Sequence, residues 1–165
     1  MEVYPDFINH KLVTPSDIPM LIEDRTEDLI WTNGCFDIIH AGHITYLYEC
    51  KMLGGKLIIG LNSDDSVRRL KGAGRPVNPV DDRILQLAAL FFVDYIFVYD
   101  EDTPLKWIQQ IGPDILVKGG DYQVKDIVGY EDVIYQGGRV LTIPLVAGKS
   151  TSSIIKKIMK SDDND

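Results

Sequence analysis

The sequence predicts an α/β fold in which a doubly wound parallel sheet of about five strands is covered by helices on both faces. Three observations predict it. Short apolar runs of strand length alternate with segments in which apolar residues recur at helical spacing. The segments that resemble ligand-binding loops all follow predicted strands. With 165 residues, 45% of them hydrophobic, the chain is long enough for one core and too short for two ordinary domains.

The elements follow in a regular order. Residues 1–27 hold three prolines among polar residues, which predicts an N-terminal extension with a short helix at about 16–24 that packs on the core or on a partner. Residues 28–160 form the predicted domain, and 161–165 a disordered acidic tail. Predicted strands are 28–32, 56–61, 95–99, 115–118 and 140–144; predicted helices begin near 43 and at 80, 103, 131 and 151. Such alternation indicates a Rossmann-like sheet, with ligands at the carboxyl ends of its strands.

The most informative segment is 31–43, Trp-Thr-Asn-Gly-Cys-Phe-Asp-Ile-Ile-His-Ala-Gly-His, because it places His40 and His43 where a strand is followed by a helix. Free backbone N–H groups and the positive end of the helix dipole attract anions at such a point. Two imidazoles there can hydrogen-bond a phosphate whose negative charge grows during a reaction. On its own the pair is a weak signal, since paired histidines are more often structural or incidental.

The charge is acidic overall and basic in one segment. A formal net charge of −8 argues against nucleic acid as a partner, because duplex binding needs a basic face. Residues 68–83 nevertheless hold five lysines and arginines against two aspartates. Arg68 and Arg69 fit a solvated helix face. Glycines and prolines place Lys71 and Arg75 in a loop, so that with Arg83 they predict a cationic clamp for a small polyanion.

Several features exclude other classes of site. No apolar run approaches the roughly 18 residues that span a bilayer, and the start lacks a signal sequence, which predicts a cytoplasmic protein without membrane contact. Cys35 and Cys50 have no partners at metal-ligand spacing, so we expect reduced thiols and no metal held by the protein itself. The run 148–150, Gly-Lys-Ser, resembles the end of a P-loop, but that motif needs glycine where this chain has Ile143.

Other segments together resemble one family. The run 40–43 matches the H-x-G-H motif of a nucleotidyltransferase superfamily. Six further segments in order are Gly34-Cys35-Phe36-Asp37, Asn62-Ser63-Asp64, Arg69-Leu70-Lys71-Gly72 with Arg75-Pro76-Val77-Asn78-Pro79, Glu101-Asp102-Thr103-Pro104, Lys118-Gly119-Gly120-Asp121-Tyr122 and Ser150-Thr151-Ser152. They cover about residues 28–158 and are similar to the adenylyltransferases of ADP-heptose synthesis.

That resemblance implies transfer of AMP from ATP to a heptose 1-phosphate, giving ADP-heptose and pyrophosphate without a covalent enzyme intermediate. ADP-heptose would supply lipopolysaccharide or another surface glycan. Mg²⁺ would be bound mainly through the ATP phosphates. A homo-oligomer, dimer or higher, is expected, with neither nucleic acid nor a membrane as a partner.

The resemblance also assigns roles to the matching residues. The expected catalytic residues are His40, His43 and Lys71. The expected nucleotide-binding residues are Gly34, Cys35, Phe36, Arg75, Arg83, Lys118, Gly119, Gly120, Asp121, Ser150, Thr151 and Ser152. The residues expected to bind the sugar are Asp37, Asn62 and Asp64.

Two alternatives stay open beside this assignment. A glycerol-3-phosphate cytidylyltransferase-like enzyme using CTP shares H-x-G-H, but typically has Lys-Gly-Asp-Asp where this chain has 118–121. A nucleotide-sensing protein would bind ATP without turnover; the two histidines and the basic clamp argue against it. The chain departs mildly from its family at Cys35 and Ser152, where valine or threonine and a second threonine are commoner. A backbone contact survives either change.

Overall fold

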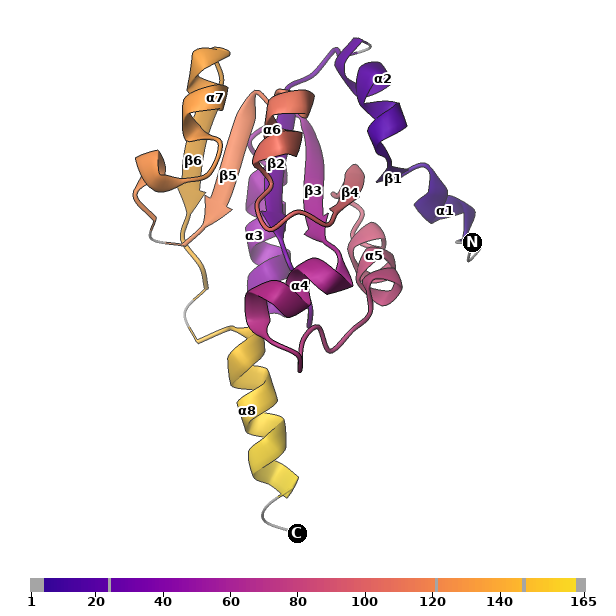
Figure 1. Cartoon of the computed structure of the whole chain (residues 1–165), viewed down its shortest axis with the longest axis vertical. Coiled ribbons are helices and arrows are strands. Elements are labelled where there is room, and N and C mark those ends of the chain that lie inside the picture. Colours follow the sequence, from indigo (N-terminus) through magenta and orange to yellow (C-terminus); the bar gives the residue numbers. More distant parts are fainter. Residues whose placement is uncertain (1–4, 24, 121, 147, 163–165) are drawn as a thin grey trace.

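The computed structural model describes residues 5–23, 25–120, 122–146 and 148–162. Its centre is a six-stranded, wholly parallel sheet in the order β1-β4-β3-β2-β5-β6 (Figure 1). The strands are β1 (Leu12–Val13), β2 (Leu29–Gly34), β3 (Lys56–Asn62), β4 (Tyr95–Tyr99), β5 (Ile115–Gly119) and β6 (Arg139–Ile143). The predicted α/β class and parallel sheet are confirmed, with six strands in place of about five.

The additional strand comes from the N-terminal segment. β1 pairs with β4, so that Leu12 lies opposite Ile96 and Val13 opposite Phe97. Two residues are too few to show the alternation by which a strand is recognised in a sequence. Ile8, just before this strand, is 0% exposed and joins the main core. The segment therefore packs on the sheet.

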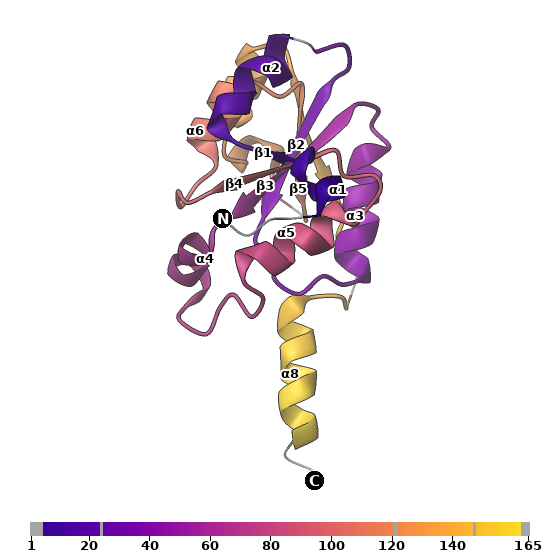
Figure 2. The same ribbon diagram turned by 90° about the vertical axis from the view of Figure 1, so that its right-hand side faces the viewer.

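Helices cover both faces of the sheet (Figures 1 and 2). One face carries α1 (Asp6–Asn9), α3 (Ala41–Lys51) and α5 (Val80–Ala88), and the other carries α2 (Ile18–Glu23), α6 (Leu105–Ile111) and α7 (Tyr130–Tyr135). Short 3₁₀ turns occupy Pro15–Asp17 and Val124–Asp126. Within the described part of the chain, no helix is both long and apolar enough to span a bilayer.

Alternation along the strands divides the core into two layers. In β3, Leu57 and Ile59 face α3 and α5, whereas Ile58 faces α2 and α6. The second layer also holds Trp31, whose ring lies so close to Gly60 that a Cβ there would come within 2.3 Å of it. The central strands are thus buried on both faces, as parallel strands require.

Helix α4 (Asp64–Lys71) was not among the predicted helices, although Arg68 and Arg69 were expected on a solvated helix face, and it includes Lys71, which was expected in a loop. Its single fully buried apolar residue, Val67, leaves no apolar periodicity to recognise. The remaining helix signals are present: the Ser63 hydroxyl accepts a hydrogen bond from the Ser66 N–H, and Gly72, at φ 95°, ends the helix. Lys71 is therefore the last residue of a helix, where its charge suits the dipole.

The last helix, α8 (Thr151–Asp162), projects from the end of the sheet (Figures 1 and 2). The Thr151 hydroxyl donates a hydrogen bond to the Ile38 carbonyl at 3.3 Å. Further out the apolar side chains of Ile158 and Met159 are 55% and 65% exposed. The predicted tail overlaps this helix at 161–162, and 163–165 lie outside the described residues.

Candidate active site

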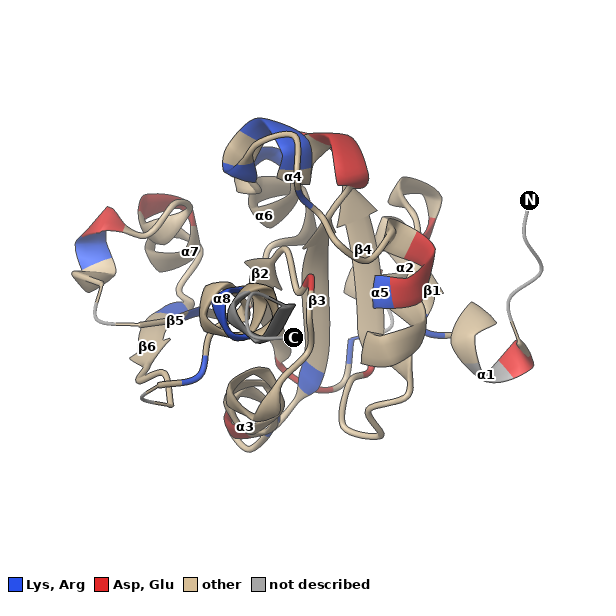
Figure 3. Cartoon of the chain, turned by 90° about the horizontal axis from the view of Figure 1, so that it is seen from below, with Lys and Arg blue, Asp and Glu red and all other residues tan. Residues whose placement is uncertain are grey.

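A pocket of about 520 Å³ opens at the carboxyl ends of β2, β3, β4 and β5, the edge where ligands of such sheets bind. Figure 3 looks onto this end of the molecule and shows lysines and arginines on α4 and α8. The predicted site residues that line the pocket are Gly34, Cys35, Phe36, Asp37, His43, Asn62, Lys71, Arg75, Lys118, Thr151 and Ser152.

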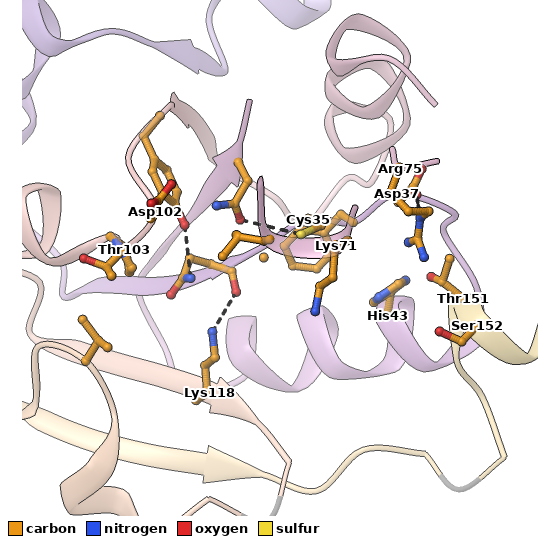
Figure 4. A pocket seen from close by; sticks show the side chains of 18 residues that line it. Cys35, Asp37, His43, Lys71, Arg75, Asp102, Thr103, Lys118, Thr151 and Ser152 are labelled. Carbon is orange, nitrogen blue, oxygen red and sulfur yellow. Dashed lines mark hydrogen bonds and ion pairs between the residues drawn. The ribbon is translucent and has the colours of Figure 1, made fainter. Parts of the chain in front are cut away.

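The pocket is elongated. Figure 4 shows Asp102 and Thr103 at one end, Lys71 between the two ends, and His43 with Thr151 at the other end. Asp102 and Thr103 come from the loop after β4, whereas Lys71, His43 and Thr151 come from three different helices. A ligand that fills the pocket must therefore pass the amino end of α3, where His43 stands.

His40 and His43 stack with their ring centroids 3.8 Å apart and nearly parallel planes. His40 Nδ1 caps α3 by accepting the His43 N–H at 3.3 Å, so this nitrogen carries no proton. His43 lines the pocket, whereas His40 lies outside its lining, in contact with the His43 ring. The His43 Nδ1 atom is buried, without a hydrogen-bond partner among the described residues.

Burial, with the neighbouring His40, lowers the pKa of His43 to about 4, so that its imidazole is neutral near pH 7. In the unfolded chain, the same imidazole has the ordinary histidine pKa of 6.5. As the pH falls from about 6.5 towards 4, the His43 imidazole becomes protonated in the unfolded state but stays neutral in the folded state. The free energy of unfolding therefore decreases.

We therefore expect the His43→Gln variant to lose less stability than the wild-type chain when the pH is lowered from 7 to 4. Urea unfolding at pH 7, 5.5 and 4 measures this difference, and His10→Gln, at an exposed histidine, serves as the control. Equal losses in wild type and His43→Gln would show that the pKa of His43 is not depressed.

Asp37 holds the loop that precedes the histidines. It is 1% exposed, forms an ion pair with Arg75 and accepts the N–H groups of Val77 and Asn78 at 2.8 and 2.9 Å. Burial raises its pKa, but the hydrogen bonds from Asn78, Val77 and Arg75 outweigh this effect and lower it. The carboxylate is already satisfied by these groups, so a role in binding sugar hydroxyls, which the sequence suggested, has no support in this geometry.

Arg83 does not line the pocket, contrary to the predicted phosphate clamp. Its side chain is 0% exposed. Nη1 donates to the carbonyls of Cys35 at 2.7 Å and Asn62 at 2.8 Å, Nε to Asn78 at 3.1 Å, and Nη2 to Asp64 Oδ1 at 2.8 Å. The guanidinium thus ties together the loops after β2 and β3. Asp64 is held by it and also lies outside the pocket lining, away from the predicted sugar contact.

Lys71 and Lys118 are the lysines of the pocket lining. Neither has an ion-pair partner within the described part of the chain. Lys118 Nζ lies 3.4 Å from the Asn33 carbonyl, and burial lowers its pKa. Two ammonium groups without carboxylates, in a chain with 25 acidic and 17 basic residues, make this pocket suitable for an anion.

The Gly119-Gly120 pair lines a second cavity of about 350 Å³, together with Tyr122, Pro144 and Leu145. Gly120 has φ 122°, which favours glycine whatever fills the cavity. A Cβ on Gly119 would come within 2.8 Å of Leu145. The backbone thus accounts for both glycines without a ligand. Asp121, predicted beside them, lies outside the described residues.

The residues of the Ser150-Thr151-Ser152 motif have two different roles: some line the pocket and one caps helix α8. Thr151 and Ser152 line the pocket. The Ser150 hydroxyl accepts the Ser153 N–H at 3.1 Å and stays outside the lining. Ser150 therefore caps the turn that begins α8, while the next two residues face the ligand.

Seven residues that line the pocket had no predicted role, and four of them are polar: Asn33, Tyr99, Asp102 and Thr103. Asn33 Nδ2 donates to the Tyr99 hydroxyl at 3.3 Å, and Arg69 Nε holds Asp102 at 2.7 Å. The segment 101–104 belonged to the family pattern, but its residue types gave no sign of a role. Only the sheet order, which sets β4 beside β3, brings them to the site.

The chain belongs to the cytidylyltransferase-like family of nucleotidyltransferases, whose model matches residues 31–157. It is 54% identical over 135 residues to the bifunctional protein HldE of Shewanella amazonensis, covering 82% of this chain and 28% of that protein. Against the bifunctional protein HldE of Campylobacter concisus it is 47% identical over 157 residues, covering 94% of this chain and 32% of that protein. The chain thus spans about 30% of the length of these relatives.

Solved structures agree on the fold. The lipopolysaccharide core biosynthesis protein of Thermoplasma volcanium superposes with a TM-score of 0.59 and 26% identity, covering 73% of this chain and 97% of that one. Pantoate-beta-alanine ligase of Francisella tularensis, complexed with beta-gamma ATP and beta-alanine, gives a TM-score of 0.58 at 14% identity, covering 90% of this chain and 79% of that one. At that identity the second likeness shows the fold alone.

Proposed function

We propose that this nucleotidyltransferase moves AMP from ATP to the phosphate of a heptose 1-phosphate, giving ADP-heptose and pyrophosphate. The observation that carries the proposal is the elongated pocket, in which a neutral, half-buried His43 stands at the amino end of α3, beside Thr151 and opposite the polar end that holds Asp102 and Thr103. The family pattern and the identity to the HldE proteins support the choice of substrates.

The chemistry needs little from the protein beyond position and charge. The acceptor phosphate is already an anion near neutral pH, so no strong general base is required. One of its oxygens forms a bond to the α-phosphorus, and the bond from that phosphorus to the bridging oxygen breaks. The pyrophosphate leaves with the electron pair. His43, neutral, donates a hydrogen bond to the α-phosphate beside the first amides of α3.

We assign the acceptor to the end of the pocket near Asp102 and Thr103, where Asn33 and the Tyr99 hydroxyl also lie. These groups can hydrogen-bond the hydroxyls of a sugar. We assign them the sugar-binding role that the sequence suggested for Asp37 and Asp64, whose carboxylates already have partners within the protein. The other end of the pocket, near His43 and α8, then takes the departing pyrophosphate. The cavity beside Gly119 and Gly120 takes the nucleobase, whose edges can meet backbone groups there.

Mg²⁺ fits this pocket through the ATP phosphates. The described carboxylates of the lining are Asp37 and Asp102, and each is paired with an arginine, so neither is free to form a cage. Bound to the phosphates, the ion would neutralise charge on the triphosphate. Lys71 and Lys118 contribute positive charge to the same phosphates.

The proposal extends to the setting of the reaction. With ATP as donor we place it in the cytoplasm, as a step towards lipopolysaccharide or another surface glycan. We also infer a homo-oligomer, because the outer side of α3 and the end of α5 expose the apolar side chains of Ile44, Tyr48, Met52 and Phe91. A second copy of the chain would remove such a patch from water.

Donor choice tests the proposal. We expect the kcat/KM of ATP to exceed that of CTP with one heptose 1-phosphate as acceptor, measured by pyrophosphate release. A value for CTP equal to or above that for ATP would favour the cytidylyltransferase alternative, with glycerol 3-phosphate as the next acceptor to try. ATP binding without pyrophosphate release, across a panel of sugar 1-phosphates, would favour the sensing protein.

A further inference from the structure

Lys149 lies against the first turn of the histidine helix, although the sequence gave it no role. A Cβ built on Gly42 would come within 3.0 Å of Lys149 Cβ and within 3.1 Å of the His40 ring. Glycine at the third position of His-Ala-Gly-His thus lets the loop before α8 pack on α3. Lys149 N donates to the Val146 carbonyl at 3.3 Å, which shapes this loop. The side chain therefore starts between the amino ends of α3 and α8.

The charge of Lys149 is not neutralised by any carboxylate of the described residues. In this it resembles Lys71 and Lys118 of the pocket and differs from the arginines of the chain, each of which has an acidic partner: Arg25, Arg68, Arg69, Arg75, Arg83 and Arg139. The side chain is exposed, and its charge, after burial, contributes to lowering the pKa of His40. An unpaired ammonium group beside the capping histidine favours an anion at this point.

The in-line geometry of the reaction indicates which anion would lie near Lys149. Displacement at the α-phosphorus places the attacking and leaving oxygens roughly in line, on opposite sides. If the acceptor enters from the end near Asp102 and Thr103, the pyrophosphate departs towards the end near Thr151 and Ser152 (Figure 4). Lys149 directly precedes the turn that carries those two residues.

We infer that Lys149 binds the β- and γ-phosphates of ATP and stabilises the departing pyrophosphate, next to His40 and the start of α8. This inference rests on the proposed function and adds a cation to the site that the family pattern did not supply. Charge develops on the bridging oxygen as its bond to the α-phosphorus breaks, and the ammonium group lies on that side. No proton needs to be transferred, because pyrophosphate leaves as an anion.

The test compares Lys149→Ala with Lys156→Ala, which removes an exposed lysine more than a turn further along α8 and so matches the change in net charge. Lys149→Ala should weaken inhibition by inorganic pyrophosphate and raise the KM for ATP, each by about tenfold or more, the usual effect of losing a hydrogen bond to a charged group. The KM for heptose 1-phosphate should stay unchanged. Lys149→Arg should restore most of the loss, and Lys156→Ala should behave as wild type.

Two further readouts do not depend on turnover. Inorganic pyrophosphate should bind the Lys149→Ala chain at least tenfold more weakly than wild type in a direct calorimetric titration. An NMR titration should show a higher pKa for His40 in Lys149→Ala, because a repelling charge has been removed. This places the ammonium group beside the histidine in solution.

The outcomes separate the two proposals. Suppose that the wild-type chain is active. Equal inhibition of Lys149→Ala and Lys156→Ala by pyrophosphate would then overturn the role of Lys149 and leave the adenylyltransferase proposal in place. A wild type inactive with every donor and acceptor pair would overturn the adenylyltransferase proposal. In that case the direct pyrophosphate titrations still decide the anion site: equal affinities in wild type and Lys149→Ala would remove it.

Discussion

Replacing His43 by alanine is expected to lower kcat by about 10²–10³-fold, the usual effect of removing one donor to a charge that grows in the transition state. His43 is neutral near pH 7 and faces the pocket, and its Nδ1 has no partner among the described residues. In the proposed function, the part of the ring that lines the pocket makes a hydrogen bond to the substrate. ATP should still bind, because α3, Lys71 and Lys118 remain in place.

Steady-state kinetics and a direct ATP titration check this expectation. His10→Ala, at an exposed histidine, is the matched control and should keep wild-type kinetics. If His43→Ala raised KM and left kcat unchanged, His43 would contribute binding that is equal in the ground state and the transition state, and its catalytic role would be wrong.

Arg83→Met is expected to have the largest effect on stability, lowering the free energy of unfolding by about 3–5 kcal/mol, as is usual when one partner of a buried ion pair is removed. The change leaves the carbonyls of Cys35, Asn62 and Asn78 and the carboxylate of Asp64 without their donor. Arg83→Lys should recover little of this loss, because an ammonium group cannot reproduce the planar fork.

Denaturant unfolding at pH 7 measures both variants, with Arg68→Met as the control. Arg68 forms an ion pair with Asp65 on the surface of α4, and its loss should cost no more than about 1 kcal/mol. If Arg83→Lys kept wild-type stability together with a raised KM for ATP, the guanidinium would contact phosphate after all. The role that the sequence suggested would then be restored.

Apolar patterning was sufficient to predict the sheet. The strand at Tyr95–Tyr99 has the predicted bounds, and those of β2, β3, β5 and β6 differ by one or two residues. What it could not predict depends on tertiary contacts. A two-residue strand such as β1 leaves no pattern of its own, and α4 is a polar helix with one fully buried apolar side chain.

In the candidate site, too, the features that depend on tertiary contacts could not be predicted from the sequence. His43, Lys71 and the start of α8, which the sequence placed at the site, line the pocket, because backbone position and charge are visible in a sequence. The contacts of Arg83 and Asp37 favour a role in holding loops together over the predicted ligand contacts, because these two kinds of charged residue look alike in a sequence. Only the observed burial of the two side chains distinguishes these roles. Asp102 and Thr103 were missed because the adjacency of β3 and β4 is a property of the fold.

In the proposed function, helix α8 would link the affinity for ATP to the folding of a single element. Its first turn supplies Thr151 and Ser152 to the pocket, while its outer half stands away from the sheet (Figures 1 and 2). A helix of 12 residues is marginal in water unless tertiary contacts support it. Phosphate bound at its first turn would supply that support, and the free energy spent on ordering the helix would be subtracted from the affinity for ATP. The same nucleotide would then set both the occupancy of the pocket and the helical content of the chain.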